Sequence, residues 1–478
     1  MGLHRPHRTV RRQKPVQHLG RSTNGRPPLG RREEVLKTLI HNATIVNEGR
    51  IFTGSVLIED DRIAEVFETA NTMSIEQDSD VRILDSEGLI LMPGIIDTHV
   101  HFRDGGMSEN PAGTFYSESR AARAGGVTSV IDMPNTNPLT TTVEALRQKE
   151  ALAARDSAVN YGFMLGATND NIDSILAVEP TSYAAIKLFL GSSTGNMLVN
   201  DSSQLDHLFR DARKLIVAHC EEEAVIQANM LNMKRECQGT DRETAALHPQ
   251  IRNTEACFLS SYKAIERARR FGTRLHIAHI STATELSLLS NFDITQKHIT
   301  AEVTPNHLWF DDRDYLQLGN LIKCNPAIKS NDDRLALWAA LEDDLIDTIA
   351  TDHAPHTIQA KQKPYFDAPS GIPSIQHSLQ MMMEVAIDND ELLTMTVKKM
   401  CHNPAILFGI NGRGFIRKGY KADLVLIRPH VEETVTKESL LSKCGWSPLE
   451  GQTFHTRIEK VFVNGHEDGP AEPLTFCK

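Results

Sequence analysis

The sequence has few cysteines and no long apolar run, and both features exclude broad classes of protein. Its seven cysteines are scattered, odd in number and never spaced as Cys-x-x-Cys. They therefore predict a reduced, cytoplasmic protein without a cysteine zinc knuckle. Because no stretch of about 18 or more apolar residues occurs, we expect no membrane-spanning helix and no membrane partner. The net charge of −11 argues against a nucleic-acid partner for the folded part of the chain.

The first 36 residues differ in composition from the rest of the chain. They hold nine Lys and Arg residues against two Glu residues, and they contain almost no apolar side chains. Such a segment cannot bury a core, so residues 1–36 are expected to form a disordered basic tail. The tail lacks the apolar stretch of a secretory signal. Three interpretations stay open: a translated upstream or vector-derived segment, a targeting segment and a nucleic-acid-binding arm.

Apolar runs that alternate with segments of helical spacing occupy the middle of the chain. The runs are 95–100, 127–133, 161–167, 184–190, 215–219, 275–280, 299–303 and 347–350. Continuous apolar strands between helices indicate parallel strands that are buried on both faces. Residues 94–410 are therefore predicted to form a (β/α)8 barrel of the TIM type.

Short strands of another kind occur near both ends of the chain. Residues 39–46, 54–59 and 62–67 alternate apolar and polar side chains between turns, and 422–427 and 458–463 are similar. We therefore predict an α/β protein in which residues 37–93 and 411–478 together form a small β-sandwich domain.

Histidines stand at the carboxyl ends of the predicted barrel strands, where the catalytic residues of such barrels converge. His99 and His101 alternate along the first strand, so both point to one face and can share a divalent cation. His219 and His279 end the fifth and sixth strands. Each histidine alone is more often a buried structural residue, but their common position favours a metal site. His276, on the opposite face of the sixth strand from His279, is expected to be structural.

Two charged residues complete the predicted metal centre. Lys187 is flanked by apolar residues, and an unpaired ammonium is costly to bury. Lys187 either extends to the barrel mouth, or it loses its proton, captures CO₂ and bridges two metal ions as a carbamate. Asp352 ends the eighth strand, where it can contact a metal ion and act catalytically by accepting a proton from the attacking water. The alternative for Asp352 is a cap of the following helix.

The motifs around these residues resemble those of the amidohydrolase superfamily and, within it, the dihydroorotases. The motifs are PGIIDTHVHFRD (93–104), GGVTSVIDMPNTNP (125–138), HPQIRNTEA (248–256), LHIAHIST (275–282), EVTPNHL (302–308), KCNPAIKSNDDR (323–334), ATDHAPH (350–356), NPA (403–405) and GYKADLVLI (419–427). The resemblance implies reversible, zinc-dependent hydrolysis of dihydroorotate to N-carbamoyl-L-aspartate in pyrimidine biosynthesis. It also implies two zinc ions per chain. The ligands of one ion would be His99, His101, carboxylated Lys187 and Asp352. The ligands of the other would be Lys187, His219 and His279.

Arg103 carries the choice of substrate, because its guanidinium can hold the carboxylate of dihydroorotate with paired hydrogen bonds. The alternative is a structural Arg103 that pairs with Asp104 in the loop. The resemblance adds further substrate-binding residues, which are Asn135 and His356 at the carboxylate and Asn325, Ser370 and Gly371 at the ring.

The sequence departs from the family pattern in three places. Asp104-Gly105-Gly106 replaces Glu-Pro-Gly after the arginine. Asn306-His307 replaces a His-His pair, so neither residue of that pair is assigned a role. Ser370 stands where an aromatic residue is common, which would loosen recognition of the ring. Residues 356–369 form a long segment with Gln and Lys, a composition that predicts a mobile loop.

Two other functions stay open. Dihydropyrimidinases, hydantoinases and allantoinases share the metal ligands, but their substrates lack the carboxylate and they usually lack the arginine. A catalytically inactive scaffold is the second, and such proteins tend to lose metal ligands that are all present here. The expected partner is a small-molecule substrate. The sequence does not fix the oligomeric state, with which a homodimer or homotetramer is compatible.

Overall fold

The fold is taken from a computed structural model, which describes residues 37–68, 75, 79–106, 111–191, 197–236 and 239–477. The predicted basic tail lies outside the described residues. Within the described part of the chain, no helix is long and apolar enough to cross a membrane. The described cysteines are all free thiols.

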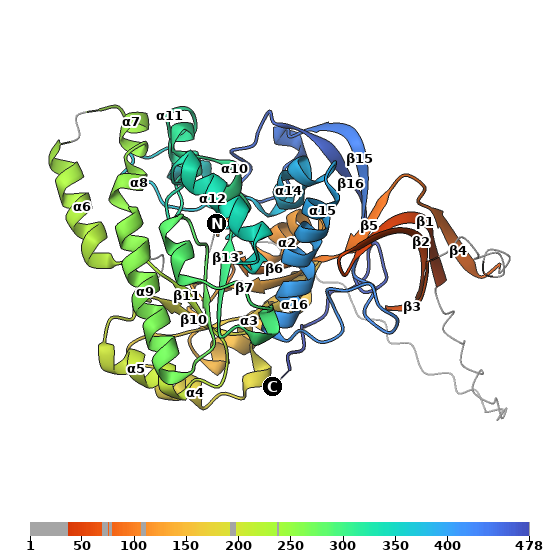
Figure 1. The fold of residues 1–478 in the computed structure, drawn as a ribbon, viewed down its shortest axis with the longest axis horizontal. Helices are drawn as coiled ribbons and strands as arrows, with labels where there is room; N and C mark the ends of the chain where they lie inside the picture. The colour runs from red at the N-terminus through yellow and green to blue at the C-terminus, as the bar shows by residue number, and fades with distance from the viewer. Residues whose placement is uncertain are drawn as a thin grey trace, which may run out of the picture. The chain divides into compact units, whose positions relative to one another are not determined.

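Parallel strands form the centre of the larger part of the fold (Figure 1). In chain order they are β6 (Ile95–Val100), β7 (Val127–Asp132), β8 (Asn160–Phe163), β9 (Leu165–Gly166), β10 (Ile186–Phe189), β11 (Ile216–His219), β12 (Leu275–Ile277), β13 (Ile299–Val303) and β14 (Thr348–Ile349). Each pairs with the next, except that β8 and β9 are one strand interrupted at Met164. A parallel bridge between Val100 and His353 joins the last strand to the first. The order is that of the predicted (β/α)8 barrel.

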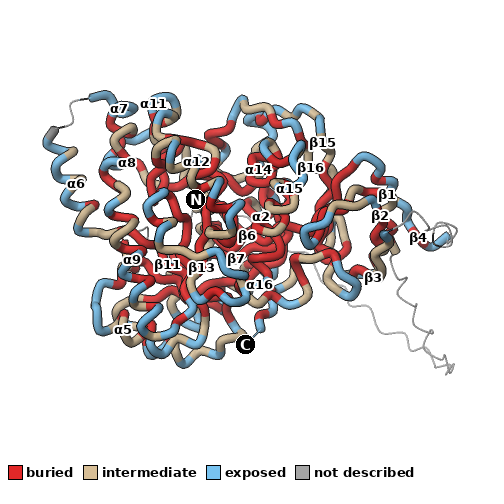
Figure 2. Tube along the Cα trace, in the orientation of Figure 1, coloured by how far each residue is buried: buried red, intermediate tan, exposed pale blue. Residues whose placement is uncertain are grey.

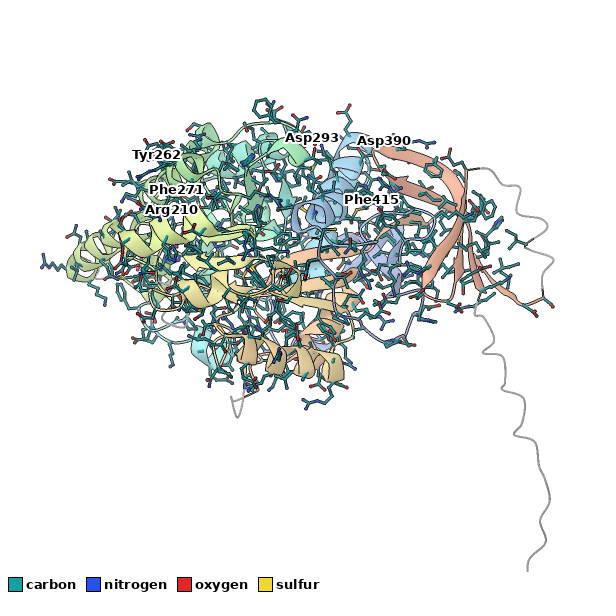
Figure 3. The ribbon with its side chains drawn as sticks, turned by 90° about the horizontal axis from the view of Figure 1, so that it is seen from below. Arg210, Tyr262, Phe271, Asp293, Asp390 and Phe415 are labelled. Carbon is teal, nitrogen blue, oxygen red and sulfur yellow. The ribbon has the colours of Figure 1, made fainter. Side chains whose placement is uncertain are left out.

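Helices cover the outside of these strands. They are α2 (Phe115–Ala124), α3 (Val143–Asp156), α4 (Ile172–Leu176), α5 (Ser202–Asp211), α6 (Glu223–Glu236), α7 (Asp241–Ala245), α8 (His248–Ile251), α9 (Thr254–Phe271), α10 (Pro305–Trp309), α11 (Tyr315–Leu318), α12 (Asn331–Glu342), α13 (Ile358–Lys361), α14 (Ser378–Ala386), α15 (Asp390–Val397) and α16 (Asn403–Phe408). The strands are buried, whereas outer helices such as α5 and α6 expose one side (Figure 2). Figure 3 labels Arg210 and Phe271 where α5 meets α9, and the guanidinium lies 5.3 Å from the ring centroid.

Local sequence explains where several of these helices begin and end. The Thr114 side chain accepts a hydrogen bond from the Ser117 amide at the start of α2, and Ser117 reciprocates. Ser330 and Asp333 form the same capping box at the start of α12. The α9 helix ends at Gly272, whose φ of 70° favours glycine. These caps satisfy amide and carbonyl groups that have no partner inside the helix.

Strands from both ends of the chain share one sheet of seven strands, as predicted for the smaller part of the fold. They are β1 (Lys37–Asn47), β2 (Arg50–Glu59), β3 (Arg62–Phe67), β4 (Val81–Asp85), β5 (Ile90–Pro93), β15 (Leu424–Thr434) and β16 (Thr453–Phe462). The amide of Ile63 in β3 donates to Tyr420 O at 2.9 Å, which ties the far edge of the sheet to the segment before β15. The sheet therefore wraps around its own apolar core, to which Ile40, Val56, Leu91 and Phe462 contribute.

Gly94 joins this sheet to the barrel and fixes the strand that carries two of the predicted ligands. Its amide donates to Asp423 O at 2.8 Å. A Cβ atom at this position would lie only 2.1 Å from Thr128 Oγ1, so the close approach of β5 and β7 needs a glycine. The β6 strand, with His99 and His101, begins at the next residue.

Candidate active site

Eleven of the twelve predicted site residues line one pocket at the carboxyl ends of the barrel strands. They are His99, His101, Arg103, Asn135, Lys187, His219, His279, Asn325, Asp352, Ser370 and Gly371. Phe189 and Ala354 also line the pocket. The twelfth residue, His356, lies beside it, with its Nε2 atom 3.5 Å from Arg103 Nη2 and 3.0 Å from Ser370 O. Residues far apart in the sequence therefore converge as the barrel prediction requires.

The two histidines of β6 share one carboxylate oxygen. Asp352 Oδ1 lies 3.2 Å from His99 Nε2 and 3.0 Å from His101 Nε2. The opposite ring nitrogens have their own acceptors, because His99 Nδ1 lies 2.7 Å from Glu302 Oε1 and His101 Nδ1 lies 2.6 Å from Asn135 Oδ1. An acceptor at each Nδ1 favours the tautomer with the proton on that nitrogen, which leaves Nε2 able to bind a metal ion when one is present.

His219 and His279 form the second half of the site. His219 Nδ1 lies 3.0 Å from His279 Nε2, and His219 Nε2 lies 3.1 Å from Glu221 Oε2. Burial lowers the pKa of both imidazoles, so they are neutral at neutral pH. Two neutral ring nitrogens that face one point from different strands are suited to a shared cation.

Lys187 lies fully buried between these two groups of histidines and Phe189. Its Nζ atom has no hydrogen-bond partner among the described residues and lies 5.0 Å from the Phe189 ring centroid. Burial lowers the pKa of Lys187 to about 8, although Glu302 and Asp352 act to raise it. A buried ammonium without a partner is unfavourable, so the surroundings favour an uncharged or anionic form of this side chain.

Arg103 presents an unused guanidinium to the pocket. Its Nε and Nη1 atoms are buried and have no hydrogen-bond partner in the described part of the chain. Asp104 does not pair with it: Asp104 accepts instead from the Gly106 amide and the Phe115 amide, each at 3.2 Å. The contacts therefore give no support to the structural alternative for Arg103. An anionic group in the pocket would satisfy the free N–H groups.

Two loops bring Asn325, Ser370 and Gly371 to the pocket. Asn325 Oδ1 is buried and has no hydrogen-bond partner within the described ranges. Gly371 has a φ of 146°, and a Cβ atom there would lie 2.4 Å from Ala354 O and 2.9 Å from His356 Cδ2. Only glycine therefore allows the 370–371 backbone to pack against His356.

The Asn306-His307 pair, to which no role was assigned, is engaged in structural contacts. His307 Nδ1 lies 2.8 Å from Thr304 Oγ1, and its Nε2 lies 3.1 Å from Pro326 O. The amide of the Asn306 side chain donates to Ser374 Oγ at 3.2 Å. Both ring nitrogens of His307 are occupied, which agrees with the absence of a predicted role.

Sequence comparison places this geometry among known proteins. The sequence profile of the amidohydrolase family matches residues 90–467, most of the chain. The chain belongs to the amidohydrolase family. It is similar to the dihydroorotase of Methanosphaera stadtmanae, with 31% identity over 404 residues that cover 84% of this chain and 89% of that protein. The dihydroorotase of Halobacterium salinarum is 36% identical over 363 residues, 76% of this chain and 82% of the relative.

The fold of this amidohydrolase also matches a solved structure. The L-hydantoinase (dihydropyrimidinase) of Arthrobacter aurescens matches with a TM-score of 0.83 and 26% identity, over 92% of this chain and 99% of the other. This amidohydrolase is a hydrolase that acts on cyclic amides. The family is typically metal-dependent, and His99, His279 and Asp352 form a cluster that can hold a metal ion, with ligand atoms within 4.8 Å of one another.

A carboxylate that the sequence analysis missed, Glu302 on β13, contacts two of the predicted metal ligands, His99 and His279. Besides His99 it accepts a hydrogen bond from the His279 amide at 3.2 Å. Its other oxygen lies 3.7 Å from His276 Nε2. Burial raises the pKa of Glu302, but His99 and His276 outweigh burial and lower it on balance. Glu302 is the one charged residue within the predicted strand 299–303 and begins the EVTPNHL motif, and a charge near the end of a buried strand was the signal that could have identified it.

His276 was expected to be structural and to lie on the opposite face of the strand from His279. It is fully buried and lies 2.9 Å from Thr300 Oγ1, so it makes structural contacts. His279 lines the pocket and His276 does not, although the His276 ring and the His279 backbone amide both contact Glu302. The β12 strand ends at Ile277, and His279 has a φ of 41°, so strand alternation does not apply to it.

Left-handed backbone occurs at three pocket residues, which are Arg103 (φ 63°), His279 (φ 41°) and Asp352 (φ 48°). Each such residue costs about 1–3 kcal/mol and persists only where its neighbours fix it. Asp97 connects the end of β6 to the segment after β14 that holds Asp352. It accepts hydrogen bonds from the His99 amide at 3.2 Å and from the Thr351 hydroxyl at 2.6 Å. The sequence analysis gave Asp97 no such role.

Proposed function

We propose that this amidohydrolase is a dihydroorotase, which reversibly hydrolyses (S)-dihydroorotate to N-carbamoyl-L-aspartate in de novo pyrimidine (UMP) biosynthesis. The observation that carries the proposal is the buried guanidinium of Arg103, whose free N–H groups face a pocket lined by metal-type ligands. Dihydroorotate differs from neutral cyclic amides by its carboxylate, the group that a guanidinium binds best. Curated dihydroorotases that are similar over most of the chain support the same choice.

The donor set fits two zinc ions per chain, and we assign its residues accordingly. His99, His101 and Asp352 would hold one ion, His219 and His279 the other, and carboxylated Lys187 both. The buried, unpartnered Nζ of Lys187 supports the carboxylation, because a carbamate removes the buried positive charge and supplies two oxygens. When bound, the zinc ions would polarise the amide carbonyl and activate the attacking water.

Asp352 is assigned the proton transfers. Burial raises the pKa of Asp352, but His99 and His101 outweigh burial, so the carboxylate is ionised at neutral pH. It can accept a proton from the water that attacks the ring amide carbon. As the carbon–nitrogen bond breaks, it can return that proton to the leaving nitrogen, which becomes the terminal amide of the carbamoyl group. Ring closure uses the same transfers in the opposite order.

Substrate binding is assigned to the two sides of the pocket. Arg103 would bind the carboxylate through its guanidinium N–H groups, with His356 and Asn135 beside it. The free Oδ1 atom of Asn325 can accept a ring N–H. The backbone at Ser370-Gly371 would face the ring from the opposite side. The partner is therefore a small molecule. A cytoplasmic location, a homodimer or homotetramer, and the absence of nucleic-acid and membrane partners complete the proposal.

A hydantoinase or dihydropyrimidinase activity is the second candidate, and the similarity to the L-hydantoinase structure favours it. An assay with dihydroorotate, hydantoin and allantoin separates the candidates. We expect turnover of dihydroorotate and little of the neutral rings. Turnover of a neutral ring with none of dihydroorotate would overturn the proposal. An inactive scaffold would contain no stoichiometric zinc and would stay inactive after zinc and bicarbonate are added.

A further inference from the structure

Buried donors that the proposed reaction does not use lie beside the ring-facing loops of the pocket. They are His248 of the HPQIRNTEA motif, Lys323 and Lys361. All three contact the backbone or side chains of two segments, 323–325 and 365–371. The first segment carries Asn325, and the second carries Ser370 and Gly371, which line the pocket.

Lys361 is the central donor of this group. It ends α13, and its side chain is 1% exposed. Its Nζ atom donates to three backbone carbonyls: Lys323 O at 3.1 Å, Pro369 O at 3.0 Å and Gly371 O at 2.9 Å. Within the described ranges, no carboxylate forms an ion pair with Lys361. The buried ammonium is therefore held by carbonyl groups, with the centroid of the Trp446 ring 5.8 Å away, and it joins the two pocket segments directly.

Lys323 and His248 bind the same two segments. Lys323 Nζ donates to Tyr365 O at 2.7 Å and to Ala368 O at 2.6 Å. His248 lies 2.6 Å from the Tyr365 hydroxyl through Nδ1 and 2.8 Å from Cys324 O through Nε2. The Gly371 amide donates to Lys323 O at 2.8 Å, so the two segments are also joined by a direct backbone hydrogen bond.

In these hydrogen bonds the two lysine side chains donate and the backbone carbonyls of the pocket segments accept. Buried carbonyls need donors, and irregular backbone cannot satisfy them through the regular hydrogen bonds of a helix or sheet. A single ammonium that satisfies carbonyls from both segments sets the spacing between them. That spacing determines how the backbone at Ser370-Gly371 lies relative to Asn325.

We propose that Lys361 is a positioning residue for ring recognition, which holds Ser370-Gly371 at a fixed place relative to Asn325. Lys361 does not touch the substrate, and it acts through the two segments that do. The proposal rests on the proposed function, since the ring in question is that of dihydroorotate.

The test compares Lys361→Met with Lys363→Met, because Lys363 is an exposed lysine two residues further along the same loop. Kinetic constants for dihydroorotate, zinc content, and hydrogen exchange of residues 364–371 without substrate are measured for both variants and the wild type. For Lys361→Met we expect KM to rise about tenfold or more, with kcat within about threefold and zinc content unchanged. Exchange in 364–371 should be faster than in the wild type. Lys363→Met should match the wild type throughout.

An unchanged KM in Lys361→Met overturns the proposal, even if exchange becomes faster, because Lys361 would then be structural only. If Lys361→Met does not fold, Lys361→Gln replaces it under the same criteria, since the amide keeps a donor. Wild-type protein without activity on dihydroorotate would refute the proposed function instead. The exchange comparison alone would then decide whether Lys361 holds the loop.

Discussion

Replacing Arg103 by Met gives the sharpest test of the substrate assignment. The change removes the guanidinium and keeps a side chain of similar width. Few internal contacts are lost, because Nε and Nη1 have no hydrogen-bond partner among the residues that the structure describes and the contact of Nη2 with His356, at 3.5 Å, is long. Burial lowers the pKa of Arg103, although Asp352 and Asp132 act to raise it. Met at this position should therefore leave the free energy of unfolding equal or higher.

The expected loss follows from the paired hydrogen bonds that the guanidinium would make to the carboxylate. A hydrogen bond between charged groups contributes about 1.5–3 kcal/mol, and two of them contribute roughly 3–6 kcal/mol. At about 1.4 kcal/mol per tenfold change, kcat/KM for dihydroorotate should fall by at least about a hundredfold. Zinc content should not change, since Arg103 is not among the assigned ligands. Arg103→Lys keeps the charge without the paired geometry, so its kcat/KM should lie between those of the wild type and Arg103→Met.

The assay measures kcat/KM for dihydroorotate and for hydantoin, with zinc content determined on the same samples. Arg147→Met on α3 is the matched control, because Arg147 is exposed on the outside of the barrel. Turnover of dihydroorotate by Arg103→Met at the wild-type rate would refute the assignment of Arg103. A parallel fall for both substrates would also count against it, because a carboxylate contact cannot affect hydantoin.

Three further changes test the rest of the site. Asp352→Asn should keep its zinc and lose about 10²–10⁴ of kcat, and residual turnover near the wild-type rate would exclude Asp352 as the proton carrier. Glu302→Gln should weaken the charge behind His99 and lower zinc affinity by about 10–100-fold in competition with a chelator; equal retention of zinc would contradict that role. Burial lowers the pKa of Lys361 to about 7 from 10.5. Between these values the unfolded chain binds more protons, so stability gains up to about 1.4 kcal/mol per pH unit as pH rises. Urea unfolding at pH 7 and pH 9 should show this gain for the wild type relative to Lys361→Met, and a constant difference would disprove it.

Regular local patterns determined much of the site from the sequence alone. Alternation along a strand places His99 and His101 on one face, and parallel strands bring their carboxyl ends to one edge. These rules depend only on spacing along the chain, so they also predicted the convergence of His219 and Asp352 in one pocket. The N-terminal and C-terminal strands were likewise recognisable from their period of two.

Tertiary structure alone decided which buried charges support these residues. Glu302 lies 203 positions from His99, and no local spacing links the two. Strand alternation does not extend to His279, because β12 ends at Ile277 and a φ of 41° turns the His279 backbone out of the strand. The Gln and Lys content of residues 356–369 predicted a mobile loop, yet Lys361 within it is buried against three carbonyls. Composition cannot distinguish a solvated lysine from a buried one, because the difference lies in the segments that fold around it.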